Sequence, residues 1–397
     1  MGQKKHSYLN IVKVYFHMYL DRTEEPKIYK TLLTSKEAIA LIGPRRAGKT
    51  TIAQKLLEDW KKTGGTGKYF DLEAMGAPAS IEELNAELEK VPHGGLIVLD
   101  EIQVLKEWIK IVREEIEYKK HKIIISGSSA SLLSKEIASS LGGRAIPEIV
   151  LPISYSDAKK WGLTSITDYL KIGGYPECVL RPYDAQKLHK LYLELTVLRD
   201  VAARKGIREI KPLLDLALIL LSEPGKTISA KKTASAIKIS QPTFRSFVDA
   251  LNDAYLVLSV LPFSRSPQEK IVADAKHYAY DVGIQNSISV STEEDIGRKF
   301  ENLVAIELIR RGYNISYLKT EKGECDFLAQ KIGEKGLAIQ VWSGTGNIPE
   351  REFSGLELGM NITKSKGLFL TKNKISLEKL EKEITIKTIE DWLLETQ

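Results

Sequence analysis

The stretch that most constrains the fold is GPRRAGKT, residues 43–50. It follows the short apolar run AIALI and opens a segment with helical spacing, TTIAQKLLEDWKKT. Gly43 and Gly48 permit a backbone that wraps closely around a phosphate, and the amides at a helix N-terminus add partial positive charge. A loop of this composition between a strand and a helix predicts a phosphate-binding loop in an α/β sheet.

Individual residues of the loop have distinct expected roles. We expect Lys49 to reach the β- and γ-phosphates of a nucleotide and Thr50 to ligate Mg²⁺. For the side chains of Arg45 and Arg46, both contact with phosphates and exposure to solvent stay open. The predicted nucleotide-binding residues are Gly43, Pro44, Arg45, Arg46, Ala47, Gly48, Lys49, Thr50, Thr51 and Ser128.

Two carboxylates, Asp100 and Glu101, end the apolar run GGLIVLDEI. The carboxyl end of a parallel strand lies at the edge of the sheet where ligands bind. Asp100 is therefore predicted to position Mg²⁺ through water, and Glu101 to be the base that orients the attacking water. The second acid favours hydrolysis of the nucleotide over binding alone.

Two more polar residues are candidates for the same site. Ser128 or Ser129, at the end of IIISGSS, can reach the γ-phosphate from a third strand. Arg144 in LGGR is a candidate catalytic arginine finger that acts on the nucleotide of its own chain or of a neighbour. An ordinary surface arginine is the alternative for Arg144.

The chain changes character along its length. Strand-like runs AIALI, KYFDL, LIVLD and KIIISGS alternate with helical patterns, which predicts a parallel sheet covered on both faces, with GGRAIP as punctuation. Further along, TISAKKTASAIKISQPTFRSFVDALNDA predicts helix, turn and helix, with Ser240 or Gln241 as cap. A strong helix after Gly297 and three strand-like runs predict another α/β unit.

The segments GPRRAGKTT, YFDLE, VLDEIQVLKEW, IIISGSSASLL, LGGR and VLPISYSDA occur in this order. They resemble the archaeal and bacterial AAA-type ATPases that border the signalling NTPases. In that family a winged helix and a nuclease-like domain of unknown role follow the ATPase core. The resemblance extends through YLKIGGYPEC, YAYDVGIQN and GRKFENLVAIEL to about Trp342. It implies ATP/ADP and Mg²⁺ as ligands and slow hydrolysis, with unchanged roles for the loop and the two acids.

The resulting fold prediction is a P-loop NTPase core with a parallel sheet, a helical and winged-helix middle, and a restriction-endonuclease-like α/β end. The core carries an N-terminal extension, and a helical lid-like region follows it. The predicted domain bounds are 1–152, 153–222, 223–285 and 286–397.

The last unit lacks part of a nuclease site. PD-(D/E)xK nucleases need two or three carboxylates and a lysine around Mg²⁺. Glu301 and Asp326 fit this pattern, but Gln340 and Trp342 stand where it requires Glu and Lys. We predict a nuclease-like fold without efficient nuclease activity. Completion of the site by Glu324 or Glu307 is the alternative.

The partner is less constrained than the nucleotide. The net charge of +6 permits a polyanionic partner without requiring one. Gln241, Thr243, Arg245 and Ser246, early in the second helix, are placed to face a DNA groove. A DNA-associated ATPase, a signalling switch that acts through protein partners and, least favoured, an ATP-dependent nuclease therefore stay open, as does assembly into oligomers.

Composition limits the compartment. Cys178 and Cys325 are far apart, which excludes a disulfide framework or a zinc cluster. The first residues show no signal-peptide pattern, and no apolar run approaches the ~20 residues of a bilayer span. We expect a cytoplasmic protein without membrane contact. The scarcity of Cys, Met and His among many Lys and Glu is typical of thermophile proteins. The expected archaeal source is implied by the family resemblance.

Overall fold

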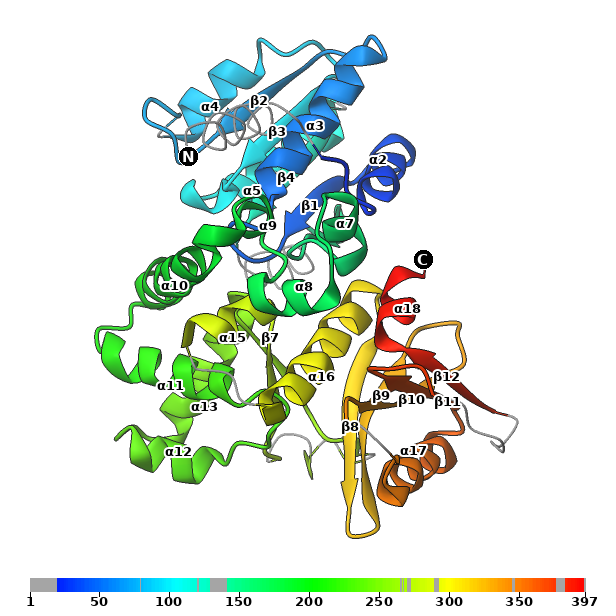
Figure 1. The fold of residues 1–397 in the computed structure, drawn as a ribbon. Helices are drawn as coiled ribbons and strands as arrows, with labels where there is room; N and C mark the ends of the chain where they lie inside the picture. The colour runs from blue at the N-terminus through cyan, green and yellow to red at the C-terminus, as the bar shows by residue number, and fades with distance from the viewer. Residues whose placement is uncertain are drawn as a thin grey trace, which may run out of the picture.

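The computed structural model describes the chain from residue 20 to residue 395, apart from short internal gaps. Figure 1 shows an α/β layer near the N-terminus, a helical middle and a second α/β layer at the C-terminus. Ser129 and most of the predicted N-terminal extension lie outside the described residues. The gaps are residues 79, 120, 129–140, 265, 267, 270–272, 289–292, 345–346 and 376–382.

The first layer is a parallel sheet that confirms the predicted core. In the described part of the chain it has five strands in the order β2-β3-β4-β1-β5. Because all strands run the same way, their carboxyl ends meet at one edge. The strands are β1 (Ala38–Ile42), β2 (Gly67–Asp71), β3 (Leu96–Asp100), β4 (Lys122–Gly127) and β5 (Ala145–Ile149).

Helices cover both faces of this sheet, which explains why β1 and β3 are buried along their whole length. One apolar cluster joins α2 and α3 to the sheet, and a second joins α4 and α5. The helices are α2 (Glu25–Thr34), α3 (Lys49–Lys62), α4 (Ile81–Leu88), η1 (Ile102–Val104), α5 (Trp108–Glu114) and the π-helical η2 (Glu115–Lys119).

Strand β5 corrects the sequence prediction, which took GGRAIP as punctuation between elements. Residues 145–149 instead pair in parallel with β1. Pro147 made this strand hard to recognise in the sequence, because proline has no backbone N–H to donate within a sheet and is confined to edge strands. The sheet order places β5 at an edge, where that loss is tolerated.

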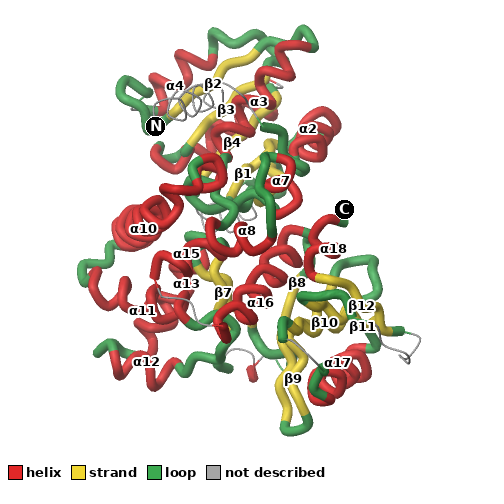
Figure 2. The backbone as a smooth tube through the Cα atoms, viewed as in Figure 1, coloured by secondary structure: helices red, strands yellow, loops and turns green. Residues whose placement is uncertain are grey.

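The middle of the chain is mainly helical, as predicted (Figure 2). Three helices, α11 to α13, precede an antiparallel pair of strands, β6 and β7. Ser240 is the cap of α13, since its Oγ accepts from the Thr243 amide at 3.1 Å. The elements are α7 (Tyr155–Lys160), α8 (Ile166–Ile172), α9 (Pro176–Leu180), η3 (Pro182–Asp184), α10 (Ala185–Leu195), the π-helical η4 (Thr196–Ala203), α11 (Ile210–Ser222), α12 (Ala230–Ala236), α13 (Gln241–Asp253), β6 (Val257–Val260), β7 (Lys276–Ala279) and α15 (Val282–Ile288).

A mixed sheet in the order β12-β11-β10-β9-β8 confirms the third, α/β unit. Its helix α16 begins at Glu293 and runs through Gly297, whereas the sequence predicted a start after that glycine. A Cβ at Gly297 would lie 2.8 Å from Ser343 Oγ, so close packing accounts for the glycine. The elements are α16 (Glu293–Arg310), β8 (Asn314–Thr320), β9 (Gly323–Gln330), β10 (Leu337–Trp342), α17 (Glu350–Thr363), β11 (Lys366–Thr371), β12 (Ile384–Thr388) and α18 (Ile389–Leu394).

The middle and the C-terminal unit share one apolar core. Tyr155 and Tyr169 from α7 and α8, Tyr278 from β7 and Phe327 from β9 belong to the same buried cluster. None of the helices in the described ranges combines the length and the apolar character that a bilayer span requires.

Candidate active site

The loop between β1 and α3 lies tightly against the end of β5. Gly43 has a φ of 145°, and a Cβ there would lie 2.1 Å from the Val150 carbonyl oxygen. Gly48 has a left-handed φ of 97° directly before α3 begins. Both glycines are thus required by the backbone, and the loop ends at the free amides of a helix N-terminus, which favour anions.

Lys49 is buried at the centre of the loop. Its Nζ donates to the carbonyl oxygens of Gly43 at 3.0 Å and Pro44 at 2.9 Å. Burial lowers the pKa of Lys49 to about 8, against the opposing charges of Glu101 and Asp100. The ammonium therefore lies where the loop can present it to a phosphate.

The Asp100 carboxylate is held by three hydroxyl groups. Thr50 Oγ1 donates to Asp100 Oδ2 at 2.7 Å, and the Tyr69 hydroxyl donates to the same oxygen at 2.6 Å. Ser126 Oγ donates to the other oxygen, Oδ1. Tyr69 and Ser126 did not enter the sequence prediction, although both lie near the carboxyl ends of strands that flank β3. Thr50 and Asp100, the two predicted Mg²⁺ residues, lie together.

Glu101 follows Asp100 in a strained backbone position. Its φ of 54° and ψ of 47° are left-handed, which costs a non-glycine residue roughly 1 kcal/mol or more. The Glu101 amide donates to Ser126 Oγ at 3.1 Å, and Gln103 Nε2 donates to its carboxylate. Hydrogen bonds with Ser126 and Gln103 therefore fix Glu101, the predicted base, at the edge of the sheet beside Asp100.

A second group of charged side chains comes from η4, the π-helical segment that follows α10. Arg45 Nε and Nη2 donate to the two oxygens of the buried Asp200 carboxylate at 2.9 and 3.0 Å. Ser128 Oγ donates to Asp200 Oδ1 at 3.2 Å and accepts from Arg204 Nη2 at 3.3 Å. The hydrogen bonds that Arg45 donates to Asp200 raise the pKa of Arg45, whereas burial lowers the pKa of Arg204. Asp200 and Arg204 were not predicted to belong to this site, because nothing in the sequence shows that residues 196–204 return to the loop.

The other predicted residues occupy different surroundings. Arg46 and Thr51 are exposed at the loop and on the first turn of α3. Arg144 directly precedes β5, where it pairs with Glu117 at 2.6 Å and donates to the Leu141 carbonyl. It therefore lies at the amino edge of the sheet, about 16 Å away from the carboxyl edge for strands of this length. The structure does not bring Arg144 to the loop of its own chain.

A cavity of about 190 Å³ lies beside Gly48 and the first turn of α3. Apolar side chains form most of its wall, and a few polar groups interrupt them, a mixture common in ligand pockets. Trp161 and residues of α9 line one side. The lining residues are Leu20, Arg22, Gly48, Thr51, Ile52, Trp161, Pro176, Glu177 and Leu180.

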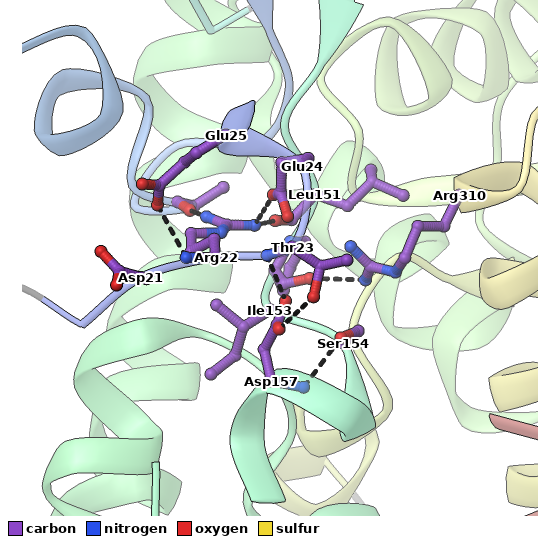
Figure 3. A network of polar contacts seen from close by, with 12 residues as sticks. Asp21, Arg22, Thr23, Glu24, Glu25, Leu151, Ile153, Ser154, Asp157 and Arg310 are labelled. Carbon is purple, nitrogen blue, oxygen red and sulfur yellow. Dashed lines mark hydrogen bonds and ion pairs between the residues drawn. The ribbon is translucent and has the colours of Figure 1, made fainter. Parts of the chain in front are cut away.

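Arg22 joins the loop to the chain just beyond β5 (Figure 3). Its guanidinium is buried and donates to the carbonyl oxygens of Ala47 and Leu151, each at 2.6 Å. Arg310 of α16 donates to the next carbonyl, that of Pro152, also at 2.6 Å. Arg22 thus connects the loop to the carbonyl of Leu151, and Arg310 connects the C-terminal unit to the next carbonyl along the chain.

The residues of the predicted nuclease site surround a lysine from outside that unit. The buried Lys276 Nζ of β7 lies 2.6 Å from Glu324, 3.3 Å from Glu301 and 4.0 Å from Asp326. Burial and the charge of Glu301 raise the pKa of Asp326 well above its usual range. Glu307 pairs instead with Arg310 and Arg311. Of the two alternatives for completing the site, Glu324 therefore lies in the cluster and Glu307 outside it.

Comparison with known proteins agrees with the first layer. A family model described as an AAA domain matches residues 35–158, and a domain of unknown function matches residues 163–295. An uncharacterized protein of Methanocaldococcus jannaschii is 31% identical over 89% of this chain and 86% of its own length. An uncharacterized protein of Haemophilus influenzae is 28% identical over 79% of this chain and 80% of its own length.

Among solved structures, the replication initiator DnaA bound to AMPPCP and single-stranded DNA matches 57% of this chain and 86% of its own. The sequence identity is 16% and the TM-score 0.30. The archaeal relative matches most of the chain, and the AAA model spans the loop and both acids. The chain belongs to the AAA-type P-loop ATPase family.

Proposed function

We propose that this protein binds ATP with Mg²⁺ and hydrolyses it to ADP and phosphate. The observation that carries the proposal is the convergence of four side chains at one sheet edge. Lys49 and Thr50 come from the loop and α3, and Asp100 and Glu101 come from the end of β3. The first three supply charge and oxygen ligands for a nucleotide and its metal, and the fourth supplies a base.

The oxygens at this edge fit Mg²⁺. Thr50 Oγ1 and Asp100 Oδ2 are hard donors 2.7 Å apart, the ligand type that this ion prefers. Thr50 would bind the ion directly and Asp100 through water. When bound, Mg²⁺ would neutralise charge on the phosphates.

The residues of the chain would divide the remaining work. Lys49 exchanges its two backbone carbonyl partners for phosphate oxygens. Glu101 orients a water molecule and accepts its proton on the carboxylate that Gln103 restrains. Ser128 donates to the terminal phosphate, and the base of the nucleotide enters the cavity beside Trp161. Arg144, far from its own loop, serves a neighbouring copy of the chain.

Turnover of Mg²⁺-ATP tests the function. Lys49→Ala is expected to abolish nucleotide binding, whereas Glu101→Gln keeps binding and lowers turnover by about 10²–10⁴, the usual contribution of a general base. Lys62→Ala, at the exposed end of α3, is the matched control and should leave turnover unchanged. Wild-type turnover in either active-site variant would contradict the proposal.

We also propose that duplex DNA contacts α12 and α13 in the manner of a winged helix. The supporting observation is that Gln241, Arg245 and Ser246 are exposed on an open groove, with Lys231 and Lys232 exposed on α12. Asp249 and Asp253 line the same groove and weaken its positive charge. Contacts between lysine or arginine and phosphate make such binding salt-dependent.

Measuring ATP turnover with and without duplex DNA separates DNA association from a switch that acts through proteins. Salt-sensitive stimulation that Arg245→Gln and Lys231→Gln reduce would support DNA as the partner. If DNA neither binds nor alters turnover, the partner is a protein and α12 and α13 serve packing.

A further inference from the structure

We propose that Asp200 is a built-in competitor for the terminal phosphate of ATP, and that displacement of its carboxylate moves the lid helix. The proposal rests on the proposed function and concerns how the same site distinguishes ATP from ADP. Asp200 lies on the π-helical segment η4, which continues α10 of the lid.

The Asp200 carboxylate occupies a ring of phosphate-binding groups. Arg45, inside the loop itself, donates to both of its oxygens, and Ser128, predicted to contact the γ-phosphate, donates to one. Arg204 Nη2 lies 3.9 Å away, and its buried Nη1 has no hydrogen-bond partner among the described residues. Two guanidinium groups and a hydroxyl are thus gathered around an anion that the protein supplies.

A terminal phosphate and Asp200 cannot share these groups. Two anions within about 4–6 Å repel each other. The site already contains the carboxylates of Glu101 and of Glu73, and Glu73 Oε1 lies 3.8 Å from Arg45 Nη2. Arg45 and Arg204 are therefore available to a phosphate only after Asp200 withdraws. ADP has no terminal phosphate, so it leaves the contact between Asp200 and Arg45 in place.

The segment that carries Asp200 is suited to movement. π-helical turns are rare, have an expanded hydrogen-bond pattern and often mark functional sites. A return of η4 to α-helical hydrogen bonding changes the register of the residues after Thr196 and carries Asp200 away from the loop. Helix α10 packs on α9, which lines the cavity beside the loop, so the movement passes to the rest of the lid.

Titration calorimetry on the full chain with β,γ-methylene-ATP and with ADP tests this competition. In Asp200→Asn the side chain keeps its shape and loses its charge, so the analogue should bind about tenfold tighter while the ADP affinity stays the same. Asp215→Asn, the same change on the neighbouring helix α11, is the control and should alter neither affinity. If Asp200→Asn leaves the ratio of the two affinities unchanged, whether or not both affinities shift together, the proposal is overturned.

A second measurement uses the wild type alone, in case Asp200→Asn fails to fold. Amide hydrogen exchange of residues 196–203 should change with the ATP analogue and remain at the ligand-free level with ADP. Equal exchange with both ligands overturns the switch and leaves ATP binding intact. If the wild type binds neither nucleotide, the proposed function itself is wrong and the switch with it.

Discussion

Thr50 Oγ1 and Asp100 Oδ2 are joined by a hydrogen bond of 2.7 Å, which connects the first turn of α3 to the end of β3. Asp100 is also held by Tyr69 of β2 and Ser126 of β4, the strands on either side. The carboxylate is thus fixed from three sides before any ligand enters. Such preorganisation reduces the ordering cost of binding.

The first prediction concerns this pair. Thr50→Ala removes the hydroxyl and should weaken the apparent Mg²⁺ affinity in ATP turnover by about 10–100-fold. Thr50→Ser keeps the hydroxyl and should remain within a few-fold of the wild type. The measurement is turnover against Mg²⁺ concentration at saturating ATP. Equal Mg²⁺ dependence in the two variants would show that the Thr50 hydroxyl is not a ligand.

The second prediction concerns the buried Lys49, whose pKa burial lowers to about 8. Phosphate binding requires the ammonium form of Lys49, so a neutral Lys49 amine must take up a proton when the nucleotide binds. Nucleotide affinity should therefore be constant below pH 8 and fall as the pH rises above it. At pH 8.5, calorimetry in buffers of different ionisation enthalpy should detect proton uptake on binding. Binding without proton exchange at that pH would place the pKa of Lys49 elsewhere.

The sequence predicted that the loop residues and the two acids lie together because each set belongs to a short motif that is recognisable by itself. A strand, a glycine-rich loop and a helix follow one another, and the acids end a second strand, so the common edge of a parallel sheet brings them together. Within the described residues of this sheet, β1 to β4 confirm the four predicted strands, and the proline-containing β5 was missed.

The sequence did not predict the contacts between residues that lie far apart in the chain. Asp200 meets Arg45 across 155 residues, and Lys276 enters the acid cluster of a separate sheet. Neither contact follows from periodicity or spacing, because local patterns do not show how segments distant in the sequence pack together. The motif around Arg144 suggested a catalytic role on the same or a neighbouring chain, and the structure places Arg144 at the amino edge of the sheet, away from its own loop.

The third prediction concerns the cavity beside the loop. If Trp161 contacts the base of the nucleotide, Trp161→Ala should weaken ATP binding by about 1–3 kcal/mol, the usual cost of losing one aromatic face on a base. Trp161→Phe keeps such a face and should lose much less. Competition between ATP and GTP measured on both variants tests the assignment. An ATP affinity unaffected by Trp161→Ala would exclude this cavity as the base site.

The fourth prediction concerns Lys276 and its three carboxylate neighbours. Burial alone would lower the pKa of Lys276. The charges of its three carboxylate neighbours, Glu301, Asp326 and Glu324, outweigh burial and raise this pKa above its ordinary value. Its stabilising contribution is therefore complete below about pH 10, the ordinary lysine range, and is lost only as the pH rises through the raised pKa. Lys276→Met should destabilise the fold by about 3–5 kcal/mol near neutral pH, because it leaves buried acids without their cation.

Denaturant unfolding of matched variants measures the effect. Lys319 also pairs with Glu324, at 3.4 Å, but is mostly exposed, so Lys319→Met should cost less than about 1 kcal/mol. The loss in Lys276→Met should shrink as the pH falls from 8 to 5, since Asp326, whose pKa is already raised, can then take up a proton. Because Gln340 and Trp342 stand on β10 where a nuclease site has Glu and Lys, the wild type should not cut duplex DNA with Mg²⁺, although Lys276 lies among the acids. Mg²⁺-dependent cleavage that Asp326→Ala abolishes would show instead that Lys276 completes a working nuclease site.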